Sequence, residues 1–235
     1  MKSSNKPRLY ISLHARGGGI RPKMPDKEDT YHWSLTILPK HKHLSPKTKP
    51  MIVGTTYHAR ELPTPIPNTT GTGTDMIFKW TYEERSTALD TMVLVRVLIG
   101  KVVDRVRLVE ILRGVPVGGQ EEGEAGVGWN CVSWVRGAVE AIKRDEDDGN
   151  GNGRGVMGKG SVLEWRVVRD AAMGFAGRKM GEGWFRSSGQ GGNGNGDGGR
   201  VATWDLVGGG GGGGKFLVDH LYIHCSGSVG CGLVF

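Results

Sequence analysis

Apolar and polar residues alternate along several short stretches of the N-terminal half, which is the spacing of half-buried β-strands. The pattern predicts strands over residues 9–13, 31–38, 51–60, 76–83 and 93–103. The last stretch is nearly continuous in β-branched residues, so we expect a central strand there. Pro63, Pro65 and Pro67 fall in the interval before residue 76 and indicate a turn-rich connection.

Helical spacing replaces the alternation after residue 104. Asp104 can cap a helix that runs to Arg113, before Gly114 and Pro116. Asn130 can cap a second helix that begins with Cys131 and ends near Arg144. Its inner face would hold the apolar residues Trp134, Val135, Ala138 and Ile142.

A third helix is predicted to begin at a capping box, the Ser161/Glu164 pair, and to carry an apolar stripe as far as Phe175. Together the elements predict an α+β fold: a small antiparallel sheet packed against the cysteine-bearing helix and two further helices.

Glycine sets the expected limits of the folded part. The 235 residues include 41 glycines, most of them after Gly114. We expect one domain over residues 8–180, preceded by a basic tail, residues 1–7. Within it, residues 39–50 would form a basic loop insertion and residues 145–160 a flexible linker. The glycine-rich region 181–235 is expected to be largely disordered, with one short strand in its apolar tail.

Charge is distributed unevenly. Residues 1–60 hold 12 Lys and Arg against three Asp and Glu, within a net charge of +7. Such an excess can attract nucleic acid, but much of it lies in the tail and the 39–50 loop, where solvated charge is the ordinary interpretation. No stretch reaches the roughly 20 apolar residues of a membrane span. An odd number of cysteines suits a reducing compartment, so we expect a soluble cytoplasmic or nuclear protein.

Cys131 is the residue that points most directly to chemistry. A thiol at a helix N-terminus lies beside unpaired N–H groups and the positive end of the helix dipole, which favour the nucleophilic thiolate. Such a cysteine needs a base and a group that orients the base. His32 and His58 could supply both if their strands pair beside the helix. A buried cysteine that merely fills space is the structural alternative.

Two other sets of residues point to ligands less strongly. Metal-capable side chains gather near the C-terminus, at Asp219, His220, His224, Cys225 and Cys231, but their spacing matches no common zinc module. The seven glycines at 208–214 lack the Lys-Ser/Thr ending of a phosphate-binding loop. The sequence therefore indicates neither a metal nor a cofactor.

Three short motifs in order, YHWSL at residues 31–35, TYHA at 56–59 and NCVSWV at 130–135, resemble circularly permuted papain-like domains. That group includes the lecithin retinol acyltransferase type and permuted relatives of the NlpC-type peptidases. The chain is also similar to an uncharacterised family of fungal proteins with the same YHW, YHA and WNC stretches. The resemblance covers about residues 8–180.

The resemblance implies that Cys131 is the nucleophile, His32 the general base and His58 the residue that orients it. The insertion between the two histidines is longer than in the compact acyltransferases. We therefore expect a cysteine-dependent hydrolase or acyltransferase that acts on an amide, isopeptide or ester, with an acyl, peptide or protein substrate. The alternative is a non-catalytic papain-like binding module that uses a basic surface to engage a protein or, less favoured, a nucleic acid.

Overall fold

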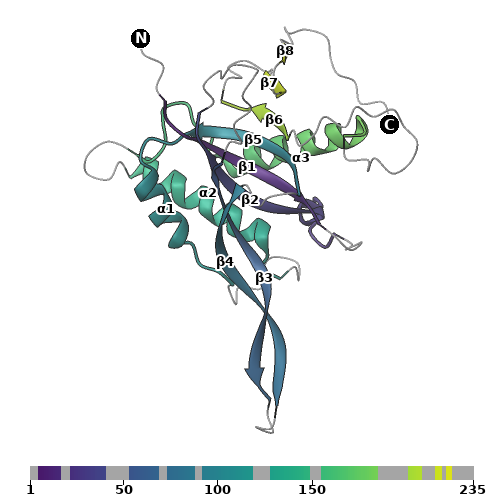
Figure 1. The fold of residues 1–235 in the computed structure, drawn as a ribbon. Coiled ribbons are helices and arrows are strands. Elements are labelled where there is room, and N and C mark those ends of the chain that lie inside the picture. Colours follow the sequence, from purple (N-terminus) through teal and green to yellow (C-terminus); the bar gives the residue numbers. More distant parts are fainter. Residues whose placement is uncertain are drawn as a thin grey trace.

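A computed structural model describes residues 5–16, 22–40, 53–68, 73–87, 92–118, 128–148, 155–184, 201–207, 215–218 and 221–223. Its centre is one eight-stranded sheet with the order β4-β3-β2-β1-β5-β6-β7-β8. All neighbouring strands are antiparallel except β5 and β6, which are parallel. Figure 1 shows the helices beside this sheet and the β3–β4 hairpin extending away from it. The α+β class expected from the sequence is confirmed.

The first five strands overlap the five stretches predicted in the N-terminal half, and the other three lie in the glycine-rich region. Their bounds are β1 Arg8–Ala15, β2 Tyr31–Leu38, β3 Thr55–Pro67, β4 Thr74–Ser86, β5 Val93–Lys101, β6 Ala202–Asp205, β7 Lys215–Val218 and β8 Leu221–Ile223. The prediction for residues 31–38 is confirmed residue for residue.

Two of the three α-helices begin where their capping residues predict. Helix α1, Arg105–Arg113, starts after Asp104, whose side chain accepts from the Arg107 N–H. Helix α2, Cys131–Asp147, starts after Asn130, whose side chain accepts from the N–H groups of Val132 and Ser133. These bonds satisfy donors that a helix N-terminus otherwise leaves unpaired. Helix α3 is Trp165–Gly181.

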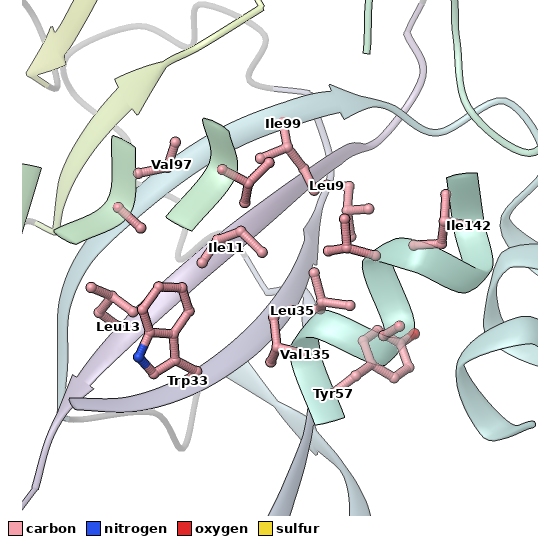
Figure 2. Close-up of a cluster of buried hydrophobic side chains, with 14 of the residues drawn as sticks. Leu9, Ile11, Leu13, Trp33, Leu35, Tyr57, Val97, Ile99, Val135 and Ile142 are labelled. Atoms are coloured by element: carbon pink, nitrogen blue, oxygen red, sulfur yellow. The ribbon is translucent and has the colours of Figure 1, made fainter. Parts of the chain in front are cut away.

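The core lies between one face of the sheet and helices α2 and α3 (Figure 2). Alternate residues of β1 and β2 point into it, among them Leu9, Ile11, Trp33 and Leu35, all fully buried. Helix α2 contributes the stripe Trp134, Val135, Ala138 and Ile142, as its spacing predicts.

Two expectations about the elements are wrong. The proline-containing interval after residue 60 is part of β3 rather than a turn. The Ser161/Glu164 capping box does not form, because Ser161 Oγ donates to the Gly158 carbonyl and Glu164 pairs with Lys143.

Described residues also lie at the expected domain limits. Both ends of the expected 145–160 linker are structured: α2 continues to Asp147, and Val156 and Met157 are buried. The folded domain does not stop at residue 180, because β6 joins the sheet beside β5. The rest of the glycine-rich region lies mostly outside the described residues.

Candidate functional site

The two faces of the sheet differ in chemistry. Trp33 and Leu35 of β2 point toward the helices, so their neighbours His32, Ser34 and Thr36 point to the opposite face. On that face β1 and β3 contribute further polar side chains. The fully or almost fully buried members are Ser12, His14, Ser34, Thr36, Thr56 and His58. A buried polar set of this kind requires hydrogen-bond partners, and neighbouring strands supply them.

His32 and His58 meet on this polar face. His32 Nε2 lies 2.7 Å from His58 Nδ1, and His58 Nε2 lies 3.1 Å from Glu83 Oε2. A carboxylate only accepts, so His58 carries its hydrogen on Nε2 and donates it to Glu83. The Nδ1 of neutral His58 then accepts from His32 Nε2–H. This assignment leaves the lone pair of His32 on Nδ1, the arrangement of a base held by an orienting group.

Burial keeps both imidazoles neutral. Desolvation is the largest cause and lowers the pKa of His32 to about 2; electrostatic repulsion from the neighbouring cationic or protonatable groups, His58 and the Arg16 and Arg60 guanidinium groups among them, acts in the same direction. Desolvation also lowers the pKa of His58, against the opposing attraction of the Glu83 carboxylate. Neutral rings agree with the donor and acceptor roles assigned above.

Sequence reasoning missed several members of the polar face. Glu83 completes the chain of hydrogen bonds and also accepts from Arg60 Nη1 at 3.2 Å. His14 Nε2 lies 2.7 Å from Ser34 Oγ. The available signal was the period-two recurrence of Ser, Thr and His in β1, β2 and β3, because small hydrogen-bonding residues at every second position differ from the charged residues of a solvated face.

Cys131 lies on the other side of β2. It is the first residue of α2, is fully buried and belongs to the core with Trp33 and Leu35. Burial raises the pKa of its thiol, although N–H groups of Trp33, Val132 and Cys131 itself and the charge of Arg16 favour the thiolate. Desolvation is the larger effect, so the thiol is protonated at neutral pH.

The structure thus brings two of the three predicted site residues together. Within the described part of the chain, no hydrogen bond joins the Cys131 thiol to His32 or His58. Two surface hollows, of about 280 and 250 Å³, lie elsewhere and are not lined by any of the three. No group of three or more His, Cys, Asp or Glu among the described residues could hold a metal ion. The candidate zinc ligands at residues 219–231 lie outside the described residues.

The outer part of the β3–β4 hairpin is a second feature, here called the arm: residues 61–67 of β3 and 74–80 of β4. The two strands pair continuously from Thr55↔Ser86 to Pro67↔Thr74, whereas β2 pairs with β3 only from Thr55 to Tyr57. The arm is therefore a two-stranded extension beyond the sheet, as Figure 1 shows.

Its two edges differ. Asn68 N–H donates to the Gly73 carbonyl and Thr87 N–H to the Gly54 carbonyl, which makes even-numbered β3 residues the ones that bond to β4. The nitrogens of Pro63, Pro65 and Pro67 consequently face the free edge of β3, where proline blocks further strand pairing. The even-numbered residues of β3 pair with odd-numbered residues of β4. The even-numbered residues of β4 therefore point their backbone N–H and C=O groups away from β3, toward the outer edge of β4, and β4 contains no proline.

One face of the arm carries an apolar row. Tyr82 packs against Trp134 of α2 at 5.6 Å, and Trp80 against Trp129 at 5.3 Å between ring centroids. Farther out, Phe78 and Met76 are 66% and 56% exposed. The row thus begins in the core and ends in solvent, beside the open edge of β4. Isolated exposed apolar residues are common on protein surfaces, whereas these two lie in one row beside a strand edge that no described strand pairs with.

These features define an α+β domain with a polar histidine cluster on one sheet face, a sealed cysteine on the other and a projecting arm. The chain belongs to a family of unknown function, DUF6914, whose model matches residues 6–210. That range includes β6 and agrees with a domain extending beyond residue 180. No curated protein matches the chain, and no solved structure does. Among the described residues, no helix has the length and apolar character needed to cross a membrane.

Proposed function

We propose that this chain is a non-catalytic binding module that takes up an extended polypeptide strand along the open edge of β4. The observation that carries this proposal is the exposed row of Met76 and Phe78 beside that edge. An added strand would bond to the outward N–H and C=O groups of β4, and its side chains would pack against the row. Much of the basic N-terminal surface expected to engage a partner, including residues 41–50 of the 39–50 loop, lies outside the described residues.

The sealed cysteine supports a non-catalytic role. A nucleophile has to reach its substrate and pass its proton to a base, and Cys131 is fully buried, with a raised pKa and no bond to a histidine. Cys131 then acts as a small core residue beneath β2. The scaffold we propose is still a permuted papain-like one, supported by the order of the two histidine strands and the Asn-Cys helix.

Peptide binding tests this function directly. An array of synthetic peptides with alternating apolar residues is probed with the chain and with Phe78→Pro, which removes an outward N–H without touching a bond to β3. We expect at least a tenfold loss of affinity. Phe78→Thr, the matched control, keeps the N–H and should lose less. Equal binding by all three proteins would refute β4 as the binding edge, and so would an absence of peptide binding by a chain that is monomeric in solution.

A second candidate is the cysteine-dependent hydrolase or acyltransferase, favoured by the Glu83–His58–His32 chain and by the N–H groups around Cys131. It requires an opening that exposes the thiol and brings it to His32 Nδ1. The thiolate would then attack an acyl carbon, the leaving group would take the proton, and water or an acceptor would release the thioester.

Alkylation of Cys131 across pH separates the two candidates. The described structure predicts slow labelling that rises only above the free-cysteine pKa of about 8.5 and is unchanged by His32→Ala. Cys131→Ser identifies the labelled site. Fast labelling near neutral pH that is lost in His32→Ala would instead establish an activated Cys-His pair and favour catalysis.

A further inference from the structure

We infer that the strand taken up by β4 is β4 of a second copy of this chain, paired antiparallel about a two-fold axis at Ile77. This inference rests on the proposed function, because it names the partner of the same edge. Three features of β4 carry it: the outward backbone groups, the placement of its charges and the length of the arm.

The backbone of β4 suits a symmetric pair. Its even-numbered residues point their N–H and C=O groups outward, as the pairing with β3 requires. With Ile77 on the axis, Met76 lies opposite Phe78 of the second copy, and these even-numbered residues exchange both backbone hydrogen bonds. Ile77 then faces Ile77 of the second copy in a position without such bonds, where opposing side chains come closest.

The charges of β4 are self-complementary in this register. Asp75 and Lys79 are exposed and form no ion pair within the described part of the chain. They lie two residues on either side of Ile77, so each Asp75 would face Lys79 of the second copy, and the pair occurs twice. Opposite charges directly across a strand pair stabilise it, and like charges destabilise it.

Neighbouring registers lack this match. Pairing centred on Lys79 would set Lys79 against Lys79 and Asp75 against Glu83 of the second copy, both like-charged. Pairing centred on Phe78 would leave Asp75 opposite Thr81. Among these three registers, only the one centred on Ile77 joins opposite charges and two apolar rows together.

The arm has the length that this pairing needs. Tyr82 is the last ring of β4 that packs on α2, and Gly73 accepts from Asn68 N–H at the outer limit of the described arm; the two residues lie on either side of Ile77 at similar distances along the strand. The tip of one arm would therefore reach the base of the other, with the two domains at opposite ends. Pro63 and Pro65 lie beside Phe78 and Met76 in β3, so the apolar row would continue across four strands.

Charge reversal tests the inference by its symmetry. Light scattering should give twice the 25.3 kDa mass for the full chain. Asp75→Lys and Lys79→Asp should each weaken the dimer at least tenfold, because each places like charges together twice. An equal mixture of the two variants should restore a dimer containing one of each, and so should the double variant. Circular dichroism confirms that every variant is folded.

The outcomes separate this inference from the proposed function. A monomeric chain that still binds array peptides through β4 would overturn the second copy and retain the binding edge. A dimer indifferent to all the charge changes would overturn the register and the use of β4. A monomeric chain that binds no peptide would overturn both.

Discussion

At the scale of single residues, His32 shows how burial and hydrogen bonding fix a chemical state. Its Nε2–H is committed to His58, whose own Nε2–H is committed to Glu83. Protonating His32 would add a charge to a desolvated ring beside Arg16 and Arg60, which explains the pKa of about 2. The folded state therefore stabilises the neutral form of His32, and lowering the pH destabilises the folded state.

The sign of the pH dependence follows from this shift. In the unfolded chain His32 takes up a proton near its ordinary pKa of 6.5, while in the fold it does so only near 2. Between these values the unfolded state binds more protons, so stability falls as pH falls, by up to about 1.4 kcal/mol per pH unit. Urea unfolding from pH 7 to 4 should show a shallower loss for His32→Gln than for the natural chain. Parallel curves would contradict the neutral buried ring.

The neighbouring positions of His32 and His58 could be predicted from hairpin pairing of their strands, whereas the register of that pairing and the position of Cys131 relative to the histidines could not. Both histidines fall in strands with clear alternation, and pairing of those strands sets them side by side. The face to which a strand turns a given residue depends on register and twist, and a shift of one residue reverses it. Glu83 was also missed, because its contact with His58 depends on the register between β3 and β4, and β4 lies two strands away from β2.

At the scale of elements, predictions succeeded where the signal is local. Asp104 and Asn130 cap their helices through their own side chains. Errors arose where residues outside the local motif supply other hydrogen-bond partners to its side chains. Lys143 donates a hydrogen bond to the Glu164 carboxylate, and Ser161 donates one to the Gly158 carbonyl. The expected capping box between Ser161 and Glu164 therefore does not form. The prolines of β3 read as turn residues, yet their nitrogens all face an edge where no N–H is needed.

At the scale of the whole molecule, the central sheet joins strands that are far apart in the sequence, β5 and β6. β6 adds to β5 in parallel after helix α3 and the following residues. Its Trp204 lies 5.8 Å from the Phe175 ring of α3, and the Arg178 guanidinium lies 5.0 Å from the indole centre. Glycine content alone could not indicate that this short segment returns to the sheet, because the signal spans only a few residues.

The importance of this pairing can be measured with two tryptophans. Trp204→Ala removes a ring packed between α3 and the sheet and should lower the free energy of unfolding by about 2–3 kcal/mol. Trp184→Ala, three residues beyond α3, removes a ring that is 41% exposed and should cost less than about 1 kcal/mol. Urea titration of both variants against the natural chain makes the comparison. If the folded unit ended near residue 180, neither substitution would matter, so a selective loss at Trp204 would show that β6 is an integral strand of the domain.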